Sequence, residues 1–188
     1  MIDTLLKQMP RLQEPAATTN LHLQPQKYFV ITLHRPANVD GEQKLKTLIN
    51  EIVQCAKGLP IIFPVHPRTA KNLQGLGIAA DNLHMIEPLS YLQFNYLVKN
   101  AKAVITDSGG ITEETTVMGV PCITLRNSTE RPETVTIGTN ELIGTNPEAL
   151  APYMEKIFAN QWKKGAIPEL WDGKTATRIV TVLTNLYP

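Results

Sequence analysis

One stretch of the sequence carries residue types suited to binding a phosphate group. It runs from Thr106 to Glu114, reads TDSGGITEE, follows an apolar run and leads into a helix-forming pattern. Gly109 and Gly110 let a ligand approach the backbone, and the free N–H groups at a helix N-terminus attract an anion. Ser108 supplies a hydroxyl, which serves either a phosphate oxygen or the helix as its N-cap. The stretch therefore predicts a phosphate-binding loop, with an ordinary capped helix as the alternative.

The two glutamates that close this stretch have different expected roles. Glu113 and Glu114 are adjacent, and successive helical residues are rotated by about 100°, so both cannot face one ligand in the same way. Glu114 lies one turn beyond Gly110, where a carboxylate suits the two hydroxyls of a ribose. Glu113 then remains an acid on the helix face, stabilised by the helix dipole. The alternative is that both acids only stabilise the first turn of the helix.

Two further loops combine histidine with arginine. The segment TLHRPAN at residues 32–38 holds His34 and Arg35, and the segment VHPRT at residues 65–69 holds His66. An arginine fork suits a diphosphate, and a histidine donates or transfers a proton. The alternatives are structural: His34 bonds backbone carbonyls, Arg35 pairs with a carboxylate, and the second loop is a stiff turn flanked by prolines.

Two more segments complete the candidate site. The segment EPLSYLQF at residues 87–94 contains Tyr91 and Phe94, which either help to hold a flat base or pack inward from a helix. The segment TERPE at residues 129–133 contains Arg131, which either contacts a phosphate or sugar or pairs with the acids beside it. Both segments are expected to follow strands of the same sheet.

The elements that must position these loops alternate between strands and helices. Apolar, β-branched runs predict strands at 28–33, 60–65, 83–86, 103–106, 122–125 and 140–143. Helical spacing predicts helices at 42–57, 90–100, 111–118, 147–159 and 175–186. This alternation is typical of the α/β class with a single Rossmann-like, doubly wound parallel sheet. Ligands bind such sheets beyond the carboxyl ends of the strands, where the loops described above lie.

The chain divides into a leading segment and one domain. Residues 1–26 are expected to form a short helix and then an irregular connector, rich in proline, glutamine, threonine and asparagine from residue 10 onward. Residues 27–188 are expected to form the Rossmann-like domain, which closes with a C-terminal helix.

Composition and motif content argue against several classes of protein. The net charge is +1 and the basic residues do not cluster, so neither nucleic acid nor an anionic membrane is an expected partner. The sequence has no apolar run long enough to span a membrane. The histidines and the two cysteines lack metal-ligand spacing, and GxGxxG and GxSxG motifs are missing. We expect a reducing, cytoplasmic location, and neither a metal nor a cofactor.

In this order, the loops resemble the C-terminal domain of the non-hydrolysing UDP-N-acetylglucosamine 2-epimerases. The resemblance spans essentially the whole chain, and its most specific parts are DSGGxxEE at residues 107–114 and TERPE within residues 129–133. It implies a two-domain, GT-B-like fold, of which this chain is the C-terminal, UDP-binding half. Residues 1–4 are similar to the segment that links the two domains in this family.

The resemblance also implies roles for individual residues. The positions that bind the nucleotide match Leu89, Phe94, Ser108, Gly109, Gly110 and Glu114. Leu89 and Phe94 frame the uracil, Ser108 and Gly110 bind phosphates, and Glu114 takes the ribose hydroxyls. His34 and Arg131 match positions that face the diphosphate and the sugar, which makes His34 the candidate catalytic residue. Arg35 and His66 match positions that bind a second, activating UDP-GlcNAc in some bacterial members, although Pro36 stands where many members have another arginine.

The reaction that the resemblance implies interconverts UDP-GlcNAc and UDP-ManNAc. UDP is eliminated to leave a 2-acetamidoglucal and then adds back to the opposite face of the sugar. The family's acid/base carboxylates come from its N-terminal domain, which these 188 residues lack. The chain alone is therefore expected to bind UDP and UDP-GlcNAc without turnover, and the full-length enzyme to be a homodimer. The alternatives are a stand-alone UDP-sugar-binding module and an epimerase for a diacetamido uronic acid UDP-sugar.

Overall fold

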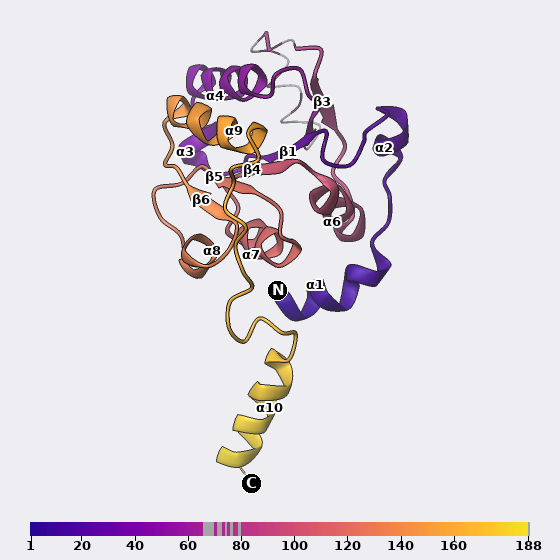
Figure 1. Cartoon of the computed structure of the whole chain (residues 1–188), viewed down its shortest axis with the longest axis vertical. Helices are drawn as coiled ribbons and strands as arrows, with labels where there is room; N and C mark the ends of the chain where they lie inside the picture. The colour runs from indigo at the N-terminus through magenta and orange to yellow at the C-terminus, as the bar shows by residue number, and fades with distance from the viewer. Residues whose placement is uncertain (66–69, 71–72, 74, 76, 79, 188) are drawn as a thin grey trace.

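A parallel sheet forms the centre of the protein. The computed structural model describes residues 1–65, 70, 73, 75, 77–78 and 80–187. Its strands are β1 (Phe29–Thr32), β2 (Ile61–Pro64), β3 (Leu83–Ile86), β4 (Ala103–Thr106), β5 (Cys122–Thr124) and β6 (Asn140–Leu142). They are ordered β3-β2-β1-β4-β5-β6, and every neighbouring pair is parallel (Figure 1). The predicted Rossmann-like, doubly wound sheet is confirmed, including the short sixth strand.

Helices cover both faces of the sheet. In chain order the helical elements are α1 (Ile2–Gln8), η1 (Met9–Arg11), α2 (Ala16–Asn20), α3 (Pro36–Val39), α4 (Glu42–Cys55), α6 (Tyr91–Asn100), α7 (Gly109–Met118), α8 (Glu133–Thr136), η2 (Pro147–Ala149), α9 (Leu150–Phe158) and α10 (Thr175–Leu186). Helices α3, α4 and α9 lie against one face, and α6 and α7 lie against the other. Helix α3 was not predicted, and the predicted helix at 147–159 begins with the separate turn η2.

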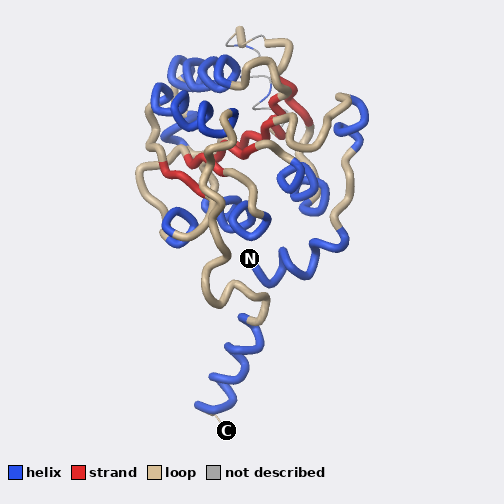
Figure 2. The backbone as a smooth tube through the Cα atoms, in the orientation of Figure 1, coloured by secondary structure: helices blue, strands red, loops and turns tan. Residues whose placement is uncertain are grey.

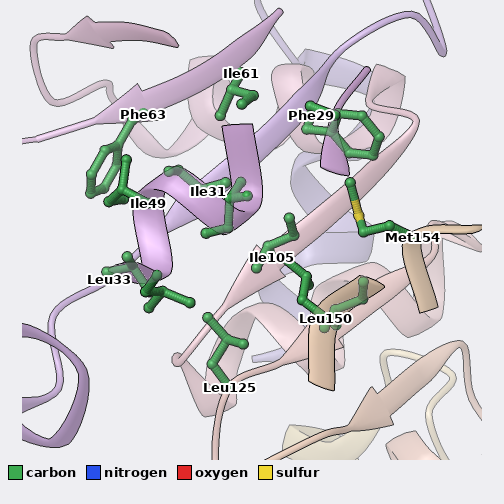
Figure 3. Close-up of a cluster of buried hydrophobic side chains, with 14 of the residues drawn as sticks. Phe29, Ile31, Leu33, Ile49, Ile61, Phe63, Ile105, Leu125, Leu150 and Met154 are labelled. Atoms are coloured by element: carbon green, nitrogen blue, oxygen red, sulfur yellow. The ribbon is translucent and has the colours of Figure 1, made fainter. Parts of the chain in front are cut away.

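Alternate strand residues build two cores, one on each face of the sheet. Phe29 and Ile31 of β1 pack with Ile49 of α4 on one side (Figure 3). Val30 packs with Leu97 of α6 on the other side. Burial on both faces explains why the strands read as nearly continuous apolar runs. It also fixes the strand register, because a slip by one residue would exchange the two faces.

The leading segment is more ordered than the sequence predicts. The connector at residues 10–26 was expected to be irregular, but it contains the end of η1 and the whole of α2, which corrects that expectation. Helix α1 packs against α7, and its Leu5 is fully buried. The leading segment therefore lies against the helix that begins at the predicted phosphate loop.

Helix α10 extends away from the rest of the molecule (Figure 2). Its first turn is held to α1, since the Ala176 N–H donates to Asp3 Oδ2 at 3.1 Å, but none of its residues is buried. The exposed side chains of Ile179, Leu183 and Leu186 recur at helical spacing and form one apolar side. Across the residues that the structure describes, no helix combines the length and apolarity required to cross a membrane.

Candidate functional site

The carboxyl ends of β1, β4 and β5 lie side by side at one edge of the sheet. Thr32 is in register with Thr106, and Thr106 is in register with Thr124. The Oγ1 atoms of Thr32 and Thr106 are 2.6 Å apart, and Thr106 Oγ1 also accepts the Ser108 N–H at 2.9 Å. The loops that follow these three strands therefore meet in one place, as the parallel topology requires.

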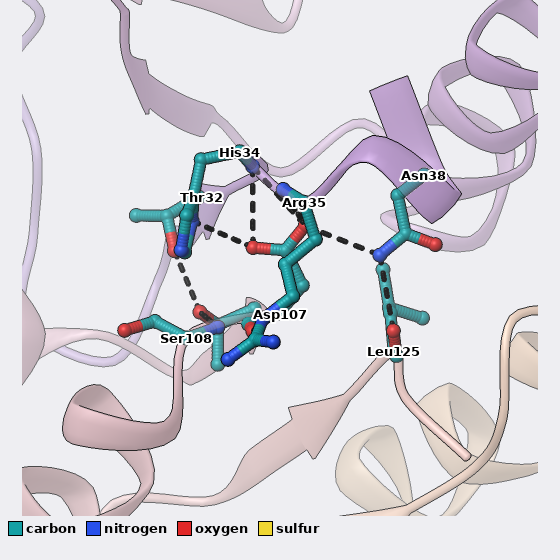
Figure 4. Close-up of polar contacts among 8 residues, drawn as sticks. Thr32, His34, Arg35, Asn38, Asp107, Ser108 and Leu125 are labelled. Atoms are coloured by element: carbon teal, nitrogen blue, oxygen red, sulfur yellow. Dashed lines mark hydrogen bonds and ion pairs between the residues drawn. The ribbon is translucent and has the colours of Figure 1, made fainter. Parts of the chain in front are cut away.

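A buried carboxylate occupies the centre of this place. Asp107 directly follows β4, and its side chain is 0% exposed. Its Oδ1 lies 2.7 Å from Nδ1 of His34. The backbone N–H groups of His34 and Arg35 donate to the same carboxylate over 2.9–3.2 Å (Figure 4). Because the His34 side chain is 59% exposed, its ring is held on one side and open on the other.

Arg35 and Asn38 complete the surroundings of this carboxylate. Arg35 Nε donates to the main-chain oxygen of Asp107 at 3.2 Å. Asn38, buried in α3, donates from Nδ2 to Asp107 Oδ2 at 3.1 Å and to the carbonyl of Leu125 at 3.0 Å. Helix α3 can begin here because Pro36 has no N–H to satisfy at a first helical position. The structural alternatives for this loop are thus corrected: His34 bonds a carboxylate, and Arg35 bonds a backbone carbonyl.

The sequence alone predicts no role for Asp107 or Asn38. A signal was available, because a Rossmann-like strand order places the first strand beside the fourth. The residues just after Thr32 must then face the residue just after Thr106. An acid at that position can accept from the turning backbone of the first loop.

Helix α7 begins without a side-chain cap. Ser108 precedes the helix with an extended backbone, and its hydroxyl makes no capping hydrogen bond, so the alternative of an ordinary cap is not found. The first N–H groups of an α-helix lack partners within the helix. A Cβ added to Gly109 would lie 3.3 Å from Arg126 Nη1, and one added to Gly110 would lie 2.7 Å from Met1 Cε. Both glycines therefore stand where the backbone is approached closely.

The two adjacent glutamates of α7 face different neighbours. Glu113 was expected to be a helix-face acid, but it is 11% exposed, and its Oε1 accepts from Arg131 Nε at 2.8 Å. Glu114 is 4% exposed and faces the side chains of Tyr91 and Asn95 in α6. Burial raises the pKa of Glu114, and hydrogen bonding from these two residues opposes that shift.

Two arginines of the β5–α8 connection lie next to this helix. Arg126, which is nearly buried, donates both Nη atoms to Glu130 at 2.8 and 2.7 Å. This pairing holds the pKa of Glu130 down at about 2. Arg131 borders a hollow of about 390 Å³ between α1, α7 and α10, together with Glu113 and Trp171. Sequence reasoning singled out Arg131 but gave no role to Arg126, which fixes the loop beside Gly109.

The predicted base-binding residues lie at the start of α6. Ser90 and Gln93 form a capping box that fixes this end of the helix. Leu89 and Phe94 are partly buried and pack against the core on the α6 face. The packing alternative is thus found for Phe94 but not for Tyr91, which is exposed. Leu89 also borders a groove of about 670 Å³ beside β3 and α2. The contacts of Leu89 and Phe94 with a base remain predictions.

His66, the other predicted histidine, lies outside the described residues. Among the residues that are described, no group of three or more His, Cys, Asp or Glu side chains could hold a metal ion.

The strand order and the position of α7 define a Rossmann-like α/β domain, in which a helix N-terminus lies at the carboxyl ends of the strands. A family model described as UDP-N-acetylglucosamine 2-epimerase matches residues 1–184. This chain therefore belongs to the UDP-N-acetylglucosamine 2-epimerase family.

Individual relatives agree with this assignment. The chain is 43% identical, over 84% of its length, to 44% of the UDP-N-acetylglucosamine 2-epimerase of Methanocaldococcus jannaschii. It superimposes with a TM-score of 0.78 and 37% identity on a crystal structure of that organism's UDP-GlcNAc 2-epimerase in complex with UDP-GlcNAc and UDP, covering 98% of this chain and 52% of the other. A UDP-2,3-diacetamido-2,3-dideoxy-D-glucuronate 2-epimerase of Pseudomonas aeruginosa is 35% identical over 68% of this chain and 36% of its own. The chain thus spans about half the length of these and similar curated relatives.

Proposed function

We propose that this chain is the UDP-sugar-binding, C-terminal half of a GT-B-like isomerase that interconverts UDP-GlcNAc and UDP-ManNAc. The observation that carries the proposal is the start of α7, where the Ser108 hydroxyl makes no capping hydrogen bond, at the same edge of the sheet as the exposed side chain of His34. The similarity to a relative whose structure contains UDP-GlcNAc and UDP supports the same ligand class.

In this proposal, α7 binds the phosphates and the ribose, and the start of α6 binds the base. Ser108, Gly109 and Gly110 receive the phosphates, because a helix N-terminus stabilises negative charge. Glu114 accepts the ribose hydroxyls from its place one turn farther along α7. The base rests between Leu89 and Phe94 at the start of α6.

His34 and Arg131 act on the diphosphate as it leaves the sugar. In the elimination, the C1–O bond to UDP breaks with its electron pair going to the phosphate oxygen, and the C2 proton passes to a base. In the reverse addition UDP returns to C1 while C2 gains a proton on the other face. Donors fixed in advance stabilise the charge that develops on UDP. Arg131 is suited to this task because Glu113 fixes its Nε while the side chain stays half exposed.

The acid/base groups that move the C2 proton are assigned to an N-terminal half outside this chain, and the full-length enzyme is proposed to be a homodimer. The apolar side of α10 supports a partner for this domain, because Leu183 and Leu186 are exposed without any buried residue in that helix. Contiguous exposed apolar surface marks an interaction site in many proteins.

Two further assignments concern the sugar and a second ligand. The relative from Pseudomonas aeruginosa favours a diacetamido uronic acid UDP-sugar as the second candidate substrate. Arg35 is proposed, together with His66, to help bind a second, activating UDP-GlcNAc.

Titration calorimetry and NMR test the proposed function. The chain is expected to bind UDP, and UDP-GlcNAc no more than modestly better, and to produce no UDP-ManNAc alone. Co-expression with the N-terminal half of the Methanocaldococcus jannaschii relative is expected to restore UDP-ManNAc formation. Failure to bind UDP at millimolar concentration would overturn the proposal, and UDP-ManNAc formation by the chain alone would refute the assignment of the acid/base groups to a missing half.

A further inference from the structure

The contacts of Asp107 determine where the proton of His34 resides. Its carboxylate accepts from the N–H groups of His34 and Arg35, from Nδ2 of Asn38 and from the ring of His34. An ionised carboxylate has acceptors and no donor. The ring nitrogen that faces Asp107 must therefore carry a hydrogen, whether the imidazole is neutral or charged.

The orientations of the two partner side chains are fixed by their surroundings. The amide of Asn38 must direct Nδ2 inward, because it also meets the carbonyl of Leu125, which can only accept. The ring of His34 must direct Nδ1 at Asp107, since a ring carbon would be too close at the 2.7 Å separation. Neither side chain can be reversed without losing these hydrogen bonds.

We propose that Asp107 is a positioning residue that keeps the proton of neutral His34 on Nδ1, so that UDP binding draws a second proton onto Nε2. The proposal rests on the proposed function for the placement of the diphosphate. In neutral His34 the exposed Nε2 holds a lone pair, which repels a phosphate oxygen. Proton uptake converts this acceptor into a donor and places an imidazolium between Asp107 and the diphosphate.

The other charged groups near His34 do not perform this task. Arg35 lies beside it on the same loop and bonds the Asp107 carbonyl. The Arg126–Glu130 pair lies on the β5–α8 connection, where each side chain neutralises the other. Asp107 is the group in direct contact with the ring.

The substitution Asp107→Asn is expected to move the proton of neutral His34 from Nδ1 to Nε2. The oxygen of the new amide can still accept from the backbone N–H groups and from Asn38, and its nitrogen then donates to a bare Nδ1. The proton of neutral His34 moves to Nε2, which becomes a donor without any uptake. The matched control is Asp40→Asn, which removes the same charge from the end of α3.

Nitrogen-15 NMR of the free chain tests the positioning role directly. His34, assigned by its loss in His34→Gln, is expected to give the Nδ1–H tautomer in the wild type and in Asp40→Asn. Asp107→Asn is expected to give the Nε2–H tautomer. An Nε2–H tautomer in the wild type overturns the proposal, and this readout requires neither a ligand nor a stable Asp107 variant.

Calorimetry with UDP in buffers of different ionisation enthalpy tests the proton uptake. At a pH where NMR shows His34 neutral, the wild type and Asp40→Asn are expected to take up most of a proton on binding. Asp107→Asn and His34→Gln are expected to take up almost none. UDP binding to the wild type without proton uptake overturns this inference and leaves the proposed function intact. Absence of UDP binding instead refutes the proposed function, and the tautomer result is unaffected.

Discussion

Arg131 Nε lies 2.8 Å from Glu113 Oε1, so the loop before α8 is tied to the second turn of α7. The next residue, Glu114, faces Tyr91 and Asn95 of α6 instead. Adjacent helical residues differ by about 100° in direction, which explains why the two acids serve different neighbours. One acid therefore fixes the arginine expected at the sugar, while the other lies toward the expected nucleotide.

The first prediction compares these two acids in UDP binding. Glu114→Gln keeps the shape but removes the charge, and hydrogen bonds to a charged group are each worth roughly 1.5–3 kcal/mol. UDP affinity is expected to fall about ten-fold or more. Glu113→Gln weakens only an ion pair with a half-exposed arginine, so affinity is expected to fall less than about three-fold. Equal losses in calorimetry would contradict the assigned direction of α7.

The second prediction concerns the pH dependence of stability. Burial raises the pKa of Glu114 in the folded chain, so its contribution to stability is fully present below the unfolded pKa and is lost as pH rises through the folded value. Glutamine cannot ionise, so Glu114→Gln avoids the loss of stability that ionisation of the buried carboxyl group causes. The variant is expected to unfold at higher urea concentration than the wild type at pH 7, with the difference shrinking toward pH 4. If the stability difference between Glu114→Gln and the wild type grew as the pH fell, the prediction would be contradicted.

The third prediction concerns the buried amide of Asn38. Asn38→Asp would place a second carboxylate against Asp107, across a contact that now measures 3.1 Å, and would lose the bond to Leu125. Removing partners from a buried charge costs several kcal/mol, so this variant is expected to lose at least about 3 kcal/mol at pH 8. Asn38→Ala is expected to lose about 1–3 kcal/mol. Urea unfolding at pH 8 and pH 5 checks both values, and only the aspartate variant should recover stability in acid.

The fourth prediction concerns the apolar side of α10. Replacing Leu183 and Leu186 by serine is expected to change the free energy of unfolding by less than about 0.5 kcal/mol, because both side chains are exposed. The matched buried control is Ile157→Ala in α9, which is expected to cost about 2–5 kcal/mol. Binding of a hydrophobic dye should fall in the serine variant. A large loss of stability there would mean that α10 packs on the domain.

Much of the fold could be predicted because burial on both sides makes parallel strands apolar throughout. The strands at 61–64 and 103–106 stand out in the sequence for this reason. The start of α7 stands out because two adjacent glycines follow a strand. Helix α3 is too short to show a period, and only Pro36 at its first position indicates it. The turn η2 could not be separated from α9, since both keep helical spacing.

The internal contacts of the site were less predictable than its location. His34 and Asp107 are separated by 73 residues and meet only because β1 lies beside β4. Whether Ser108 caps α7, and whether Glu113 remains on the helix face, depends on which partner each side chain meets. The side-chain rotamer and the position of the neighbouring loops determine that partner. Glu113 pairs with Arg131 across 18 residues, a contact that no local pattern indicates.

The hollow beside Arg131 also has an optical consequence. The chain has two tryptophans, and one of them, Trp162, donates its indole N–H to Thr139 and packs edge-on to Tyr153. The other, Trp171, borders the hollow itself. A variant with Trp162→Phe would thus leave a single tryptophan, which can be excited apart from the tyrosines, beside the side chain expected to meet the sugar. Its emission would report arrival of a ligand there without any added label.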